Sequence, residues 1–235
     1  MPIWWILFHR ISADKSYFAR GRSVPLPYAR IILPATLVLY GVPTATMLLL
    51  EHNMATLQNI IAFWQLTPIL VNVPLWFASL FVSSAPTSKT KTADLCHLKV
   101  LYGVLFLASI VIHWYTIFGM SVSRDPTVTY ASVWVPNIKK WKNELSSDLL
   151  YIFQWDWIVS GLACIISALI AVCDVWRLIY GSVSGGEAVA AGTVVLCLTL
   201  FAGPGAAITA VWYWREGNMA LIQERLSAPG AKKLT

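Results

Sequence analysis

Three polar side chains lie inside long apolar stretches of this sequence, each stretch long enough to be a membrane helix. These are Asp156, Gln65 and His113. An ionisable group at the centre of a membrane helix costs at least about 2.5–3.5 kcal/mol, so such residues are candidates for function. At about 1.5 Å per residue, they lie about 10, 12 and 15 Å from the same end of the expected bundle. We therefore expect them to share one depth.

The acid is the most informative of the three. A carboxylic acid in apolar surroundings stays protonated at neutral pH and can act as a general acid. The candidate catalytic residues are Asp156, Glu51 at the end of an apolar stretch, and His113. Each has a plainer interpretation. Asp156 could pair with His113 to hold helices together, His113 could be a hydrogen-bonded interior residue, and Glu51 could be solvated.

Aromatic side chains surround these polar residues in the sequence. Aromatic faces stabilise cations by about 0.5–2 kcal/mol each, and a dry cavity protects reactive cations from water. The pattern therefore suits protonation of an epoxide or alkene in a prenyl chain, followed by carbocation cyclisation. The alternative is that the tryptophans form a belt at the membrane interface instead of lining a cavity. The candidate substrate-binding residues are Gln65, Trp64, Phe63, Trp114, Tyr115, Tyr151, Gln154 and Trp155.

The composition indicates the environment in which this chemistry would occur. Of 235 residues, 57% are hydrophobic and 12% are charged, against about 45–50% and about 25% in soluble domains. The 12 tryptophans are typical of chains that meet the bilayer interface. The net charge of +6 is scattered between apolar runs, which argues against nucleic acid as a partner. A polytopic membrane protein is the class that remains.

Five stretches reach the length of about 20 apolar residues that a membrane crossing requires. We predict an all-α, polytopic transmembrane helix bundle that forms one domain over residues 1–235. The predicted spans are 31–50, 57–82, 100–123, 149–173 and 188–214. Residues 1–8 are apolar and could form an interfacial anchor or a partial span.

Consecutive spans alternate in direction, which sorts their connections onto two faces of the membrane. Face A holds the N-terminal arm, residues 83–99 and residues 174–187; face B holds residues 51–56, residues 124–148 and the C-terminal tail. Face A carries nine lysines and arginines and face B eight, so the positive-inside rule does not choose between them. The last four residues, 232–235, resemble a dilysine retrieval signal, which would place face B in the cytosol. The five bases before the first span favour the opposite arrangement.

Small residues and prolines interrupt the spans. A stripe of Ser160, Ala163, Cys164, Ser167 and Ala168 allows close helix packing. Residues 203–205 read Gly-Pro-Gly, and we expect them, with Pro68 and Pro74, to kink their helices.

Signatures of other chemistries are missing from the sequence. It holds no metal-ligand cluster, phosphate loop, GxSxG motif or aspartate-rich motif for Mg²⁺ and diphosphate. We therefore expect no cofactor and no metal. The expected partners are a lipophilic prenylated small-molecule substrate and membrane lipid.

Several segments resemble one enzyme family. They are GRSVPL at 21–26, LPATLVLYGVPTATM at 33–47, QNIIAFWQLTP at 58–68, VWVP at 133–136 and YIFQWD at 151–156. In this order they are similar to the fungal membrane-bound terpene cyclases of the ascofuranone and macrophorin type. The resemblance implies an endoplasmic-reticulum enzyme of meroterpenoid biosynthesis that cyclises a farnesyl-type chain by proton attack, without a metal. Asp156, the acid of FQWD, would then be the proton donor, and Gln65 its polar partner.

Rival classes remain open at this point. One is a membrane enzyme like the sterol isomerases, which also bury acids under tryptophans. Another is a non-catalytic lipid-binding or scaffold protein. A transporter is disfavoured because the sequence shows no inverted internal repeat.

Overall fold

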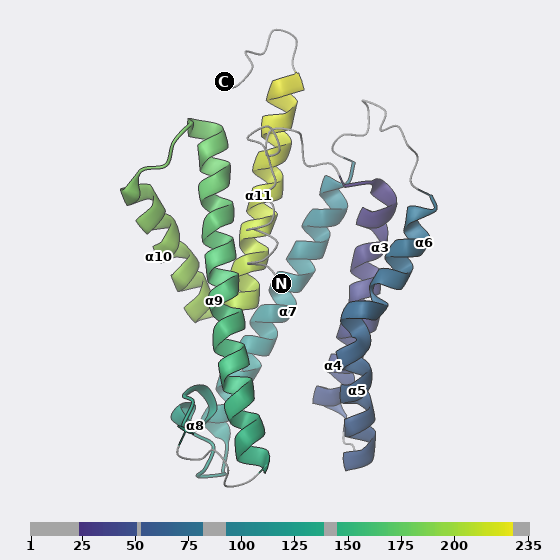
Figure 1. The fold of residues 1–235 in the computed structure, drawn as a ribbon, viewed down its shortest axis with the longest axis vertical. Coiled ribbons are helices and arrows are strands. Elements are labelled where there is room, and N and C mark those ends of the chain that lie inside the picture. Colours follow the sequence, from purple (N-terminus) through teal and green to yellow (C-terminus); the bar gives the residue numbers. More distant parts are fainter. Residues whose placement is uncertain (1–23, 51–52, 82–92, 139–144, 228–235) are drawn as a thin grey trace. The chain divides into compact units, whose positions relative to one another are not determined.

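The structure is a computed structural model that describes residues 24–50, 53–81, 93–138 and 145–227. These residues form helices joined by turns, with no strand among them, which confirms the all-α prediction (Figure 1). Five helices are long and apolar enough to cross a membrane: Leu26–Leu49, Met54–Ser79, Leu95–Val122, Ser147–Tyr180 and Gly185–Ala202. The protein is therefore a multi-pass membrane protein.

The helices fall into two compact units, whose boundary lies within helix α7 (Leu95–Val122). The N-terminal unit covers the described residues of Arg22–Leu101, and the C-terminal unit covers those from Tyr102 onward.

The first span of the N-terminal unit is a helix with a wide turn in its middle. It consists of α3 (Leu26–Thr36), the π-helix η1 (Leu37–Gly41) and α4 (Val42–Leu49). Pro34 and Pro43 lie on either side of the π-helix. Proline lacks the N–H that an α-helical turn requires, and the Val42 N–H instead reaches back five residues to the Leu37 carbonyl.

The second span begins at Asn53, whose side chain accepts the Thr56 N–H at 2.8 Å and so caps the helix. It consists of α5 (Met54–Leu70) and α6 (Asn72–Ser79), with Pro68 inside α5. The two spans pack side by side, α6 against α3 and α5 against α4 (Figure 1).

The C-terminal unit is built around α9 (Leu145–Tyr180), with the short helix α8 (Tyr130–Trp134) at its start. Helices α10 (Gly185–Ala202) and α11 (Pro204–Ser227) pack along its second half. Ala163, Ser167 and Ala168 of the predicted small-residue stripe are buried in α9. The largest described core cluster joins α9 to both helices and consists of Ala168, Ala171, Val172, Ala191, Val195 and Val211.

The structure corrects the expected fifth span. Residues 188–214 do not form one crossing: α10 ends at Ala202, and α11 runs back beside it (Figure 1). Gly203 has φ +90°, a conformation that favours glycine, and Pro204 cannot donate to the preceding turn. The Gly-Pro-Gly sequence therefore reverses the chain instead of kinking it.

The packing partners of α11 show that it runs parallel to α9. Near the start of α11, Pro204 lies against Gly161. Near its end, Met219 and Ile222 pack on Val175. The residues from Arg215 to Ser227 therefore lie at the face A end of α9. The sequence-based assignment of Arg215 and Glu216 to face B was wrong, because apolar length alone does not distinguish a crossing from a hairpin.

Candidate functional site

The short helix α8 forms one wall of a pocket at the face B end of α9. Its first turn is closed by a capping box, in which the Ser132 N–H reaches Thr129 Oγ1 at 3.1 Å and the Thr129 N–H reaches Ser132 Oγ at 2.8 Å. Its last residue, Trp134, packs on Trp157 with ring centroids 4.4 Å apart. The cap fixes the first turn of α8, and the aromatic contact holds α8 against α9.

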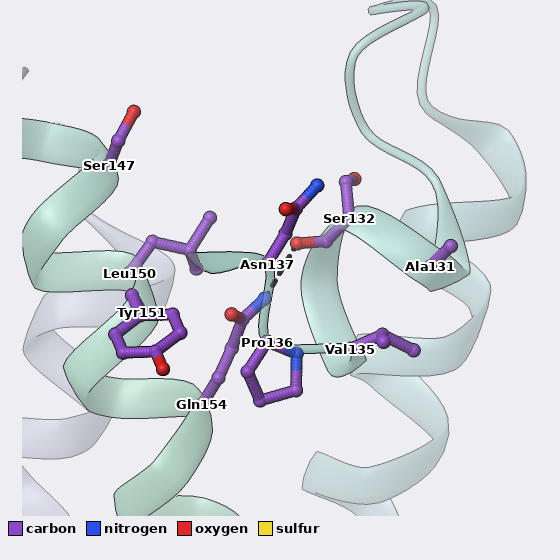
Figure 2. A pocket seen from close by; sticks show the side chains of 9 residues that line it. All are labelled: Ala131, Ser132, Val135, Pro136, Asn137, Ser147, Leu150, Tyr151 and Gln154. Atoms are coloured by element: carbon purple, nitrogen blue, oxygen red, sulfur yellow. Dashed lines mark hydrogen bonds between the residues drawn. The ribbon is translucent and has the colours of Figure 1, made fainter. Parts of the chain in front are cut away.

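The side chain of Gln154 joins the two helices. It is 7% exposed, and its Nε2 donates to the backbone oxygens of Ser132 at 2.7 Å and Val133 at 3.0 Å. Carbonyl oxygens only accept hydrogen bonds, so the amide nitrogen must face α8. The amide oxygen, Oε1, is therefore turned away from α8, toward Leu150 and Tyr151 (Figure 2).

The pocket beside this amide has a volume of about 340 Å³, within the range of small-molecule sites. The α9 residues that line it, at 147, 150, 151 and 154, share one helical face. The structure thus brings together two predicted binding residues, Tyr151 and Gln154. The full lining consists of Ala131, Ser132, Val135, Pro136, Asn137, Ser147, Leu150, Tyr151 and Gln154 (Figure 2).

Asp156 lies on a different face of α9. At about 100° per residue, it is turned about 200° from Gln154 around the helix axis. Its side chain is exposed, and no hydrogen bond or ion pair joins it to another residue in the described part of the chain. The neighbouring Trp155 and Trp157 are also exposed. Asp156 therefore does not belong to the α8–α9 pocket.

His113 has a structural partner. Its Nε2 lies 3.2 Å from the backbone oxygen of Leu200, in the last turn of α10. The carbonyls of a last turn have no partner within the helix. In a continued helix the N–H of residue 204 would donate a hydrogen bond to the Leu200 carbonyl, but residue 204 is proline and has no N–H. The geometry favours the interior hydrogen-bonded interpretation of His113, and within the described residues no contact of this kind joins His113 to Asp156.

The other predicted residues of the C-terminal unit lie near these groups without joining the pocket. Trp114 packs edge-on to His113 and tilts against Phe118, with centroids 6.1 and 5.4 Å away. Tyr115 is exposed on α7. Trp155 lies edge-on to Tyr151 at 6.5 Å and is absent from the pocket lining.

Three predicted residues belong to the N-terminal unit. Trp64 Nε1 donates to Thr44 Oγ1 at 3.1 Å, and its ring meets the edge of Tyr40. Gln65 is exposed, so its predicted association with Asp156 and His113 stays a prediction. Glu51 lies outside the described residues. Phe63 lines a shallow apolar hollow of about 500 Å³, together with Ile31, Pro34, Ala35, Val38, Leu39, Leu70, Val73 and Pro74.

Sequence reasoning missed the α8 side of the pocket. The carbonyls of Ser132 and Val133 hold Gln154 in place, and Asn137 and Ser147 line the cavity. The Thr-x-x-Ser spacing at 129–132 is the sequence signal that could have indicated the short helix. Backbone carbonyls leave no signal in a sequence, so the contact with Gln154 had none.

The sequence pattern of the CtvD domain matches residues 1–220 of the chain. No curated protein and no solved structure matches it.

Proposed function

The chain belongs to the CtvD domain family, which is related to fungal meroterpenoid and terpene cyclases, and we propose that it is an integral-membrane terpene cyclase. The proposed substrate is a meroterpenoid precursor that carries a farnesyl-type chain. The proposed reaction begins with protonation of an epoxide or alkene in that chain. Residence in the endoplasmic reticulum and independence of metal ions are parts of the same proposal.

The observation that carries the proposal is the position of Asp156 on α9. Asp156 is the only charged residue between Asp148 and Asp174 in the sequence. Its side chain is exposed, one turn before the stripe of small residues that is buried from Ala163 onward. An ionisable group facing lipid is costly, so such groups normally face a protein interior or a cavity. This supports a role for Asp156 in a reaction space inside the membrane.

The chemistry balances without a redox partner. The Asp156 carboxyl transfers its proton to the epoxide oxygen, and the C–O bond breaks as the electrons of a neighbouring alkene form a C–C bond. With an alkene as the initiating group, the proton adds to carbon instead. The cation that reaches the end of the cascade loses a proton to a base, which forms a double bond. Product and substrate are then isomers, and returning one proton to Asp156 completes the cycle.

The residues beside the acid suit this cation. Trp155 and Trp157 flank Asp156 in the sequence and are exposed on α9. The face of an indole ring stabilises a nearby cation more than other aromatic rings do. Trp157 is held in position by its contact with Trp134. Apolar surroundings also exclude the water that would otherwise capture the cation.

The test is conversion in microsomes. Microsomes that contain the wild-type protein should convert a farnesylated aromatic compound with a terminal epoxide to a cyclised isomer. Asp156→Asn should reduce this conversion by at least about a hundredfold, the low end of what a general acid contributes. The matched control is Asp174→Asn, on the same helix, where the acid is paired with Arg177 at 3.5 Å.

Two outcomes would contradict the proposal. Full conversion by Asp156→Asn at wild-type protein levels would exclude Asp156 as the proton donor. Equal loss of conversion in Asp174→Asn would show that removing either acid from α9 impairs folding, and the loss in Asp156→Asn would then not indicate a proton donor. Isomerisation of a sterol alkene, without conversion of the farnesylated compound, would favour the sterol-isomerase class.

A further inference from the structure

The α8–α9 pocket contains a hydrogen-bond acceptor whose direction is fixed by the backbone. Gln154 is more than nine-tenths buried, and both hydrogen bonds of its Nε2 go to the carbonyls of Ser132 and Val133. Its Oε1 has no hydrogen-bond partner within the described residues. Among the described residues Oε1 is not one of the fully buried atoms that lack a partner, so it is accessible, and a ligand hydroxyl or N–H can donate to it.

The pocket also has a defined chemical character around this oxygen. Ser147, one helical turn from Tyr151, supplies a hydroxyl that can donate or accept. Leu150, Val135 and Pro136 supply apolar walls. An ionised carboxylate has no hydrogen to donate, so it does not match the Gln154 oxygen.

These features favour a ligand that carries a hydroxyl group on a hydrocarbon skeleton. A hydroxyl can donate to Gln154 Oε1 and accept from Ser147, whereas an ether or a ketone can only accept. The cavity of about 340 Å³ is large enough for a ring or a short carbon frame. Its place at the face B end of a long apolar helix favours a molecule that also has a hydrocarbon tail.

We propose that the α8–α9 pocket binds the hydroxyl-bearing head of a membrane amphiphile, a phenol or an alcohol, with Gln154 Oε1 as the acceptor. The site is separate from Asp156, which lies on another face of α9. It therefore does not depend on the cyclisation chemistry, and either proposal can fail without the other.

The experiment measures ligand binding to the full-length protein in phosphatidylcholine nanodiscs. Tritiated 4-nonylphenol is the probe, and unlabelled compounds compete with it. Unlabelled 4-nonylphenol should displace the probe, whereas 4-nonylanisole, its methyl ether, should compete about tenfold less well because it has lost one donated hydrogen bond. Equal competition by the phenol and its ether would overturn the proposal, and this comparison needs no variant protein.

A pair of variants locates the site. Leu150→Trp should fill the pocket and reduce binding at least about tenfold, because Leu150 lines the cavity without contributing to the Gln154 hydrogen bonds. Leu162→Trp introduces the same ring at an exposed α9 position outside the lining and should bind as wild type does. Unchanged binding in Leu150→Trp would exclude this pocket.

Two further competitors identify the source of the head group. Displacement by farnesol indicates a prenyl alcohol, and displacement by cholesterol indicates a membrane sterol; both support a hydroxyl head. Failure of every hydroxyl compound to compete would overturn the proposal. Asp156→Asn should still bind the phenol, so lost conversion with retained binding separates this site from the proposed catalytic one.

Discussion

The Nε2 atom of His113 on α7 lies 3.2 Å from the backbone oxygen of Leu200 on α10, beside the point where the chain reverses at Gly203. Because a carbonyl only accepts, Nε2 carries the proton. A side chain from another helix thus supplies the hydrogen bond that Pro204 cannot. Broken helices persist at membrane depth where neighbouring groups satisfy the freed backbone in this way.

Replacing His113 should therefore weaken the fold. In His113→Leu the Leu200 oxygen loses its donor, which should cost about 1–3 kcal/mol of unfolding free energy. Denaturant unfolding of the protein in detergent measures the loss. His113→Gln, which keeps an N–H donor, should recover part of it. His97→Leu, on the same helix, is the control, since no hydrogen bond of His97 appears among those described. A His113→Leu protein as stable as wild type would contradict the assigned role.

Gly203 should tolerate no side chain. A Cβ at this position would lie 3.0 Å from His113 Nδ1, and its φ of +90° is strained for any other residue. Gly203→Ala should lose about 1–3 kcal/mol from backbone strain alone. Gly192→Ala on α10 is the matched control, because a Cβ there meets nothing within 4 Å. That control should be neutral or more stable, since alanine is the better helix former. Thermal unfolding of both variants gives the comparison.

Gln154 should hold α8 in place as well as face the pocket. In Gln154→Leu the carbonyls of Ser132 and Val133 lose a donor, and α8 keeps its contact between Trp134 and Trp157. We expect the amides of Val133 and Val135 to exchange hydrogen roughly tenfold faster or more. Hydrogen exchange with mass spectrometry measures this rate. Gln58→Leu, an exposed position on α5, should leave it unchanged.

The bounds of the membrane spans were predicted closely from the sequence, because the placement of apolar residues in the membrane determines them. The first three spans begin and end within about six residues of the expected positions, because hydropathy and bilayer thickness set their length. The prediction of the fifth span was wrong because a Gly-Pro sequence such as that at Gly203 and Pro204 allows either a kink or a reversal of the chain. Packing decides between these, through Gly161 against Pro204 and Val175 against Met219.

The candidate site was predictable to a smaller extent. Tyr151 and Gln154 were both predicted to bind substrate, and residues three apart on one helix lie on the same face. Asp156, two residues further, had been grouped by depth with Gln65 and His113. Depth along a helix does not give the direction of a side chain around it. The backbone acceptors for Gln154 were beyond sequence reasoning altogether.

The reversal at Gly203 also changes the expected topology. Because α11 runs parallel to α9, its bases Arg215 and Arg225 belong with face A. With the sequence-based assignment of the other bases kept, face A counts eleven lysines and arginines, face B counts Arg124, Lys139, Lys140 and Lys142, and Lys232 and Lys233 lie outside the described residues. On this count the positive-inside rule, undecided for five crossings, predicts that face A lies in the cytosol.

We therefore predict that residues 124–129 and the end of α11 lie on opposite sides of the membrane. The chain has no Asn-x-Ser/Thr sequence, so one introduced acceptor reports its own location through glycosylation in the lumen. An acceptor inserted with a short spacer after Asp125 should be glycosylated, and one inserted after Ser227 should not. An acceptor after Gly181, between α9 and α10, should also stay unmodified. Glycosylation after Ser227 together with that after Asp125 would mean that residues 188–214 cross the membrane, contrary to the hairpin.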